Sequence, residues 1–195
     1  MGDTNYREGR TFADTFLATQ KIILADLFGV TSGVVRTSTD SEDWNDGVDV
    51  YVADIGVGLR VRRHSDRPFK DFTLRLRRNQ NGHHELDKVR AGKIAFLLYC
   101  IDTSAPGTAA TDLAWWLIDL APIRKAGMNL LADVKTELQG NKDGTTFLAI
   151  DLESLIAKYG PVLMAMGTTT TTTTTVTTTK TVHPDFAPQG ERHVR

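Results

Sequence analysis

The chain has 195 residues, of which 41% are hydrophobic, so it can bury one sizeable core and shows no composition change that requires a second folded domain. Its 23 Lys and Arg residues are balanced by 24 Asp and Glu residues, and the formal net charge of −1 excludes a globally basic nucleic-acid coat. A single cysteine, Cys100, excludes an internal disulfide framework, and the longest apolar runs are too short to span a bilayer. We therefore expect a cytoplasmic protein with no membrane partner.

The first half of the chain predicts one helix followed by short strands. Apolar residues recur at helical spacing over residues 11–28, with Thr11 available as the N-cap and Gly29 as the stop. A polar, turn-rich stretch follows at 31–46. Three short strands in sequence then suggest an antiparallel meander, at 48–52, 58–64 and 71–78.

The second half predicts alternating helices and buried strands. Two runs, 94–102 and 113–120, are apolar on both faces, which is typical of central strands. The other expected elements are a helix at 83–93, a helix at 123–138, a strand at 145–151 and a helix at 152–160. The fold class expected is α/β or α+β, with a mixed central sheet, a three-strand meander and flanking helices.

Twelve threonines occupy the fourteen positions from Thr168 to Thr181. Such a run has little to bury and no pattern that sets a strand register, so we expect a single domain over 1–166 and a disordered, threonine-rich tail over 167–195. Because β-branched threonine also favours extended backbone, a trailing strand is the alternative.

The segment 60–78 concentrates positive charge, with seven arginines and one lysine against two acids. Strand alternation predicts that the leucines and Phe72 point one way, while the arginines point the other. Like charges on neighbouring strands repel, so such a face needs acids or an anion such as phosphate to neutralise it. The candidate nucleic-acid-binding residues are Arg60, Arg62, Arg63, Arg75 and Arg77.

The order of helix, three strands, helix and strand, with Asp49 on the first strand, resembles the core of the PD-(D/E)XK nuclease superfamily, the restriction-endonuclease-like enzymes. The segment FTLRLRRNQNGHHELDKVRAGKIAFLLYCID is also similar to uncharacterised phage and bacterial nuclease-like proteins. The resemblance covers residues 45–150. It implies a restriction-endonuclease-like fold and phosphodiester cleavage of DNA by a metal-activated water.

By the same resemblance, Asp49 matches the first acid of the active site, and the span 58–64 matches the acid-x-Lys motif. Arg60 then stands where the second acid belongs and Arg62 where the lysine belongs. An arginine cannot ligate Mg²⁺, so either the metal site is lost or its second acid comes from elsewhere, with Glu85, Asp54 and Asp71 as the nearby candidates. The expected catalytic residues are Asp49, Glu85 and Lys88, with Asp49 and Glu85 holding Mg²⁺.

Two functions of different classes remain open. The first is a nucleic-acid-binding protein of nuclease-like fold, with DNA as the expected partner and RNA as the other, and with Mg²⁺-dependent cleavage. The second is a non-catalytic interaction or structural protein of phage or bacterial type, in which internal or subunit salt bridges neutralise the arginine face. Enough acidic residues lie nearby to neutralise the arginine face in this way. They are Asp46, Asp49, Asp54, Glu85 and Asp87.

Overall fold

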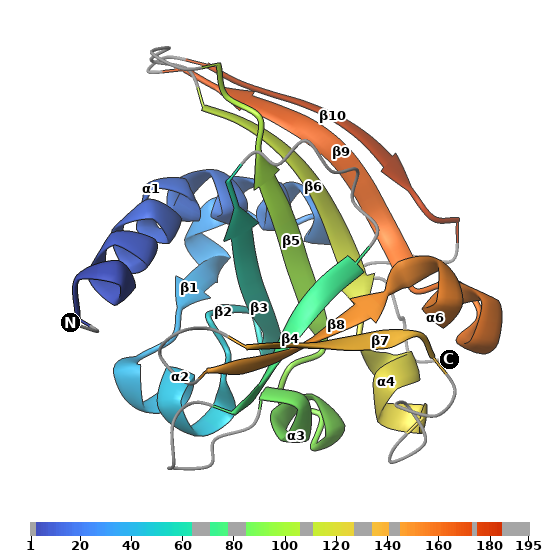
Figure 1. The fold of residues 1–195 in the computed structure, drawn as a ribbon. Coiled ribbons are helices and arrows are strands. Elements are labelled where there is room, and N and C mark those ends of the chain that lie inside the picture. Colours follow the sequence, from blue (N-terminus) through green and yellow to red (C-terminus); the bar gives the residue numbers. More distant parts are fainter. Residues whose placement is uncertain are drawn as a thin grey trace.

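The computed structural model describes residues 3–63, 71–77, 85–105, 111–126, 134–140, 145–172 and 175–184. For residues 3–10, 44, 77 and 126 it describes the backbone alone. Within these ranges the chain forms two sheets and several helices (Figure 1). The helical elements are α1 (Asp3–Phe28), a 3₁₀ turn (Ser32–Val34), α2 (Asp40–Asp46), α3 (Glu85–Arg90), α4 (Ala121–Ala126) and α6 (Leu152–Tyr159).

The larger sheet has seven strands in the order β1-β2-β3-β5-β6-β9-β10. All neighbours are antiparallel except β3 and β5, which run parallel, so the expected mixed sheet is confirmed. Its strands are β1 (Val35–Thr37), β2 (Val50–Val52), β3 (Ile55–Arg62), β5 (Phe96–Asp102), β6 (Thr111–Asp119), β9 (Leu163–Thr171) and β10 (Val176–Val182).

The smaller sheet has three antiparallel strands in the order β4-β8-β7 and crosses one face of the larger sheet (Figure 1). Its strands are β4 (Asp71–Arg77), β7 (Thr136–Gly140) and β8 (Thr146–Asp151). Helix α1 covers the opposite face of the larger sheet, so the molecule has three layers. The architecture is therefore mixed α+β.

Two hydrophobic clusters fill the two spaces between these layers. Between the sheets, Phe72 and Leu74 of β4 pack with Tyr99 of β5 and Ile150 of β8. Beneath α1, Leu24 packs with strand residues that include Leu98, Cys100 and Trp115. Strand β5 contributes alternate residues to both clusters, as the apolar pattern of residues 94–102 predicts.

The expected meander is wrong at its third strand. β2 and β3 form an antiparallel hairpin, but β4 joins the smaller sheet and pairs with β8. The strand on the other side of β3 is β5. The three consecutive strands of the larger sheet are thus β1, β2 and β3, and β1 comes from the stretch expected to be turns.

Two further expectations are corrected. Helix α1 begins at Asp3, so Thr11 lies inside the helix and is not its N-cap, whereas Gly29 ends it with a φ of +65°. The expected helix at 123–138 is replaced in part by β7, because Thr136 begins a strand that pairs with β8. Residues 127–133 of that expected helix lie outside the described part of the chain.

The threonine run is not disordered in its described residues. It forms the end of β9 and most of β10, an antiparallel hairpin at one edge of the larger sheet. The boundary expected at residue 166 falls inside β9. Buried Thr169 anchors the hairpin to β6. Its hydroxyl accepts a hydrogen bond of 3.0 Å from the indole Nε1 of Trp115 and lies 3.0 Å from the hydroxyl of Thr178 on β10. The alternative expectation, a trailing strand favoured by β-branched threonine, therefore describes this segment.

Candidate functional site

Asp49 lies immediately before β2, and its backbone fixes its position. Its N–H donates to the carbonyl of Val57 at 3.2 Å, and its carbonyl accepts from both the N–H and the hydroxyl of Ser38 at 3.0 Å. The side chain then turns along β3, where Oδ2 accepts the backbone N–H of Leu59 at 2.6 Å. Asp49 is therefore held on the loop between α2 and β2 with its carboxylate beside β3.

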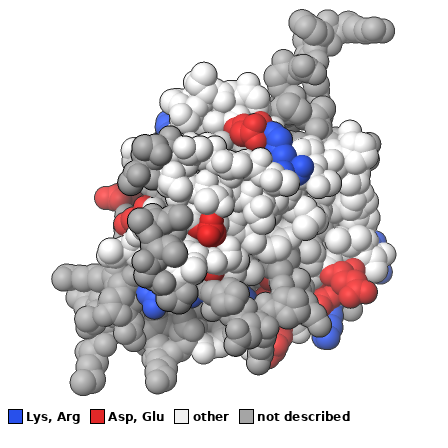
Figure 2. Space-filling model, turned by 90° about the horizontal axis from the view of Figure 1, so that it is seen from above, with Lys and Arg blue, Asp and Glu red and all other residues white. Residues whose placement is uncertain are grey.

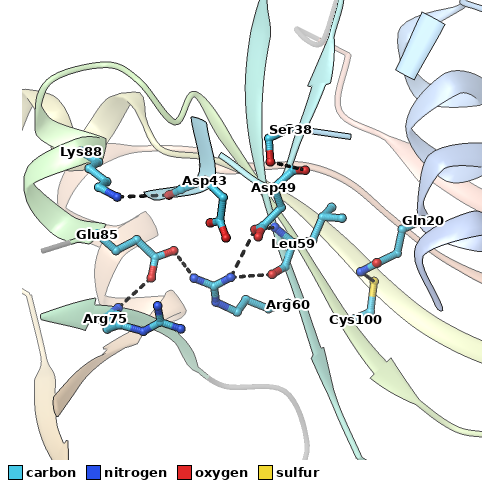
Figure 3. Close-up of polar contacts among 10 residues, drawn as sticks. All are labelled: Gln20, Ser38, Asp43, Asp49, Leu59, Arg60, Arg75, Glu85, Lys88 and Cys100. Atoms are coloured by element: carbon cyan, nitrogen blue, oxygen red, sulfur yellow. Dashed lines mark hydrogen bonds and ion pairs between the residues drawn. The ribbon is translucent and has the colours of Figure 1, made fainter. Parts of the chain in front are cut away.

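Arg60 on β3 lies between two carboxylates (Figure 3). Its Nη1 donates to the Leu59 carbonyl at 2.6 Å and is 3.4 Å from Asp49 Oδ2, while its Nη2 donates to Oε1 of Glu85. The Arg60 side chain is 23% exposed, so this ion pairing takes place largely out of water. Charge-assisted hydrogen bonds of this kind are stronger than neutral ones.

Glu85, the first residue of α3, connects the two sheets. It is only 6% exposed, and its second oxygen, Oε2, accepts the backbone N–H of Arg75 on β4 at 2.9 Å. One carboxylate therefore bonds to Arg60 of the larger sheet and to the edge of the smaller sheet. Buried carboxylates are rare unless paired in this way.

The ionisation of this cluster is shifted by its surroundings. Burial raises the pKa of Asp49 to about 6, and this effect outweighs the opposing influence of Arg60 and of the Leu59 N–H. Burial opposes the charge on Arg60, but Glu85 and Asp49 outweigh it and raise the pKa of that guanidinium. Arg60 thus carries its charge permanently, while Asp49 titrates close to neutral pH.

Lys88 lies on the next turn of α3 and reaches toward α2. Its Nζ donates to the backbone carbonyl of Asp43 at 3.3 Å, and burial lowers its pKa. Gly47, at the end of α2 with a φ of +66°, lies beside the Lys88 stem, where an added Cβ would be 2.6 Å from Lys88 Cδ. The expected catalytic lysine therefore has a contact that ties α3 to α2.

The other expected binding residues do not form one arginine face. Arg62 is 43% exposed, is 3.4 Å from Asp71 and lies over the ring of Tyr99, whereas exposed Arg63 lies over the ring of Phe12 on α1. The Arg75 guanidinium packs near Phe147. The backbone of Arg77 pairs with Thr146, and its side chain lies outside the described part of the structure. The expectation of one common arginine face is wrong, because β3 and β4 belong to different sheets.

The expected metal ligands converge, but on a guanidinium. Asp49 and Glu85 both contact Arg60, and each also accepts a backbone N–H. Mg²⁺ requires a nearly ideal octahedron of oxygen ligands, and the charge of Arg60 opposes a cation at this point. Among the described residues, no group of three or more His, Cys, Asp or Glu could hold a metal ion. The side chains as arranged do not fit Mg²⁺.

Sequence reasoning missed helix α2 and its Asp43, whose side chain points toward the same cluster (Figure 3). A signal for α2 was present. Thr39 and Glu42 form a capping box, in which the Thr39 hydroxyl accepts the Glu42 N–H and the Glu42 carboxylate accepts the Thr39 N–H. Glu42 also forms an ion pair with Arg36 at 2.7 Å.

Comparison with known proteins adds no relative to this description. No protein-family model matches the chain, no curated protein matches it, and no solved structure matches its fold. None of the helices in the described ranges is long and apolar enough to cross a membrane.

Proposed function

We propose that this chain is a non-catalytic interaction protein in which an internal ion-pair cluster replaces a metal-dependent active site. The observation that carries the proposal is the position of Arg60, whose guanidinium contacts both Asp49 and Glu85. Arg60 supplies the positive charge that two neighbouring carboxylates require. A divalent cation would have to displace this guanidinium, which is part of the chain itself.

Other arginines also have acidic partners close by. Arg36 pairs with Glu42 and Arg62 with Asp71. In the view from above, blue and red residues lie scattered or side by side among white ones, with no continuous blue area among the described residues on that face (Figure 2). Internal neutralisation of this kind leaves little field to attract a polyanion.

A nucleic-acid-binding protein of restriction-endonuclease-like fold is the second candidate. It is favoured in part by the element order, since α1, β1, β2, β3, α3 and β5 follow one another as in that core, although α2 is inserted between β1 and β2 and β4 between β3 and α3. It is also favoured by exposed Arg62 and Arg63 at the end of β3. On this alternative DNA is the expected partner, RNA is the other, and Mg²⁺-dependent cleavage requires that Arg60 leave its acidic partners.

The test measures binding and cleavage separately. Fluorescence anisotropy with labelled duplex DNA and single-stranded RNA, over a range of salt concentrations, should show weak binding with a shallow salt dependence. Incubation of supercoiled plasmid with Mg²⁺ or Mn²⁺ should leave it intact. Tight binding that weakens steeply with salt, and that is lost in the double variant Arg62→Ala, Arg63→Ala, would favour the second candidate.

Cleavage needs its own control. If plasmid is nicked in the presence of metal, Asp49→Asn and Glu85→Gln distinguish this site from a contaminating nuclease. Loss of nicking in both variants, with folding preserved by circular dichroism, would overturn the non-catalytic proposal. Equal nicking by the variants and the unaltered protein would assign it to contamination.

A further inference from the structure

We propose that β10 is a self-association edge, through which two copies of this chain pair antiparallel to form one continuous sheet. β10 is the last strand of the larger sheet and lies along its outer side in Figure 1. Among the described residues, β9 is the one strand that pairs with it. In the part of the chain that the structure describes, the outer side of this seven-residue strand has no strand partner, and such an edge is a template for another strand.

The hydrogen bonds of the hairpin show which backbone groups of β10 face outward. The Thr172 N–H donates to the Thr175 carbonyl at 2.8 Å, and the His183 N–H donates to the Met164 carbonyl at 2.7 Å. Between these two pairs the antiparallel ladder alternates, so Thr177, Thr179 and Thr181 direct their backbone groups to β9. The outward groups therefore belong to the even-numbered residues, which are Val176, Thr178, Lys180 and Val182.

The sequence of β10, VTTTKTV, is nearly a palindrome centred on Thr179. A two-fold symmetric dimer needs a self-complementary surface, because whenever residue i of one copy contacts residue j of the other, residue j of the first copy contacts residue i of the second. A nearly palindromic strand meets this requirement. With Thr179 on the axis, Val176 lies opposite Val182 of the second copy and Thr178 lies opposite its Lys180. All four are outward-facing residues, so this register forms four hydrogen-bonded pairs and about eight backbone hydrogen bonds.

The side chains suit the same register. Val176 and Val182 are 37% and 38% exposed, and pairing would cover each with the other. Thr179 would meet Thr179, and Thr177 would meet Thr181, as close pairs without hydrogen bonds between their backbones, where threonines pack well. Registers shifted by two residues are also competent for hydrogen bonding, but they separate the valines.

The one charge on the strand does not oppose this pairing. A lysine on an edge strand normally prevents edge-to-edge association. Here the Lys180 ammonium is 2.6 Å from the carboxylate of Asp26 on α1, so it is neutralised within its own copy. In the symmetric register each lysine also meets a threonine and not the other lysine. The far edge of the same sheet, β1, has only three residues and offers a further copy much less backbone to pair with.

The inference does not involve Arg60, Asp49 or Glu85, so self-association and nucleic-acid binding are measured separately and either can fail alone. The first experiment is sedimentation velocity on the full chain from micromolar to submillimolar concentration. The unaltered protein should shift from monomer toward dimer as its concentration rises. A monomer over the whole range, or a series of larger species, would overturn the proposal.

Two charge variants test the axis. Thr179→Lys and Thr179→Glu each place like charges against one another, so each alone should remain monomeric, while an equimolar mixture should recover the dimer. Recovery in the mixture also shows that both variants fold. The matched control is Thr170→Lys, an exposed position on the same face of inner strand β9, which should dimerise like the unaltered protein. Dimers of Thr179→Lys alone would contradict the register.

A cysteine at the axis gives a direct readout. In an antiparallel pair without hydrogen bonds the facing Cα atoms are about 4.5 Å apart, which is within the range that a disulfide spans, so Thr179→Cys should form a disulfide-linked dimer under mild oxidation. Thr170→Cys should not do so at a comparable rate, and buried Cys100 should not contribute. Equal cross-linking at positions 170 and 179 would show that association is nonspecific and would refute the edge.

Discussion

The guanidinium of Arg60 on β3 and the carboxylate of Glu85 on α3 form an ion pair in the space between the two sheets. Glu85 is 6% exposed and accepts a backbone N–H from β4 with its other oxygen. The pair therefore links the larger sheet, the smaller sheet and a helix. Glu85, expected as a catalytic residue and metal ligand, is bonded here to a guanidinium and to a backbone N–H.

Removal of Arg60 should destabilise the fold strongly. In Arg60→Met the side chain keeps much of its volume, but Asp49 and Glu85 lose the charge between them. A buried ion pair broken on one side costs about 3–5 kcal/mol, because the remaining charge is left uncompensated. Urea-induced unfolding followed by circular dichroism measures the loss.

Arg62→Met is the matched control for Arg60→Met, two residues along the same strand. In its ion pair with Asp71, the Arg62 side chain is 43% exposed and the Asp71 side chain is 38% exposed. Loss of this pair should therefore cost at most about 1 kcal/mol of stability. If the two variants lose equal stability, Arg60 is not the charge that holds these elements together.

The raised pKa of Asp49 predicts a particular dependence of stability on pH. An aspartate ionises near pH 3.9 in an unfolded chain, whereas Asp49 ionises at about 6 in the folded protein. Between these values the folded state binds more protons, so the contribution of Asp49 to the free energy of unfolding falls as pH rises from about 4 to about 6. Above that window it is constant.

Asp49→Asn should remove this decline, because an amide does not titrate. Subtracting the pH profile of the variant from that of the unaltered protein should leave a decrease on the order of 1 kcal/mol, reduced by the 32% exposure of the Asp49 side chain. Asp54→Asn, in the exposed turn between β2 and β3, is the control. A difference profile that is flat, or that rises with pH, would contradict the raised pKa.

Local patterns predicted most of the elements but not which strands pair. The apolar runs at 94–102 and 113–120 became β5 and β6, and the apolar alternation around Phe72 correctly places that residue in the core. The destination of β4 depends on long-range pairing with β8, more than sixty residues later in the chain. Alternation within a strand carries no information about its neighbour, so the arginines of β3 and β4 were wrongly placed on one face.

At the candidate site, too, the sequence predicted the residues but not their arrangement. Asp49, Arg60 and Glu85 could be named from the sequence, and they do converge. Their roles could not be read from spacing, because the position of a guanidinium relative to two carboxylates is set by how α3 packs on β3 and β4. The threonine run was misjudged for a related reason. Its order depends on Trp115 and α1, which lie far away in the sequence.

Gly167 should be essential for the threonine hairpin. A Cβ at this position would collide with the backbone carbonyl of Thr179 and would lie 2.6 Å from the ring of Trp115. Because a backbone atom cannot move aside as a flexible side chain can, Gly167→Ala should cost about 1–3 kcal/mol and loosen β10. Hydrogen exchange of the β10 amides, combined with thermal unfolding, measures both effects.

The control for Gly167→Ala is Gly140→Ala, at the end of β7, where an added Cβ meets nothing within 4 Å. That substitution should be within about 0.5 kcal/mol of neutral. If Gly167→Ala is equally neutral and leaves β10 exchange unchanged, the close approach of β9 and β10 at this point is wrong.

Cys100 should report on opening of the layer between α1 and the larger sheet. The thiol is fully buried on β5, the amide of Gln20 on α1 lies 3.7 Å from its sulfur, and burial raises its pKa to about 12. The reactive thiolate is therefore scarce and inaccessible in the folded protein.

Modification by a thiol reagent should be very slow in buffer and rapid in denaturant. Gln20→Ala should accelerate it in buffer by loosening the contact with α1, whereas Thr15→Ala, on the exposed side of the same helix, should not. Rapid modification of the unaltered protein in buffer would show that α1 does not cover this face.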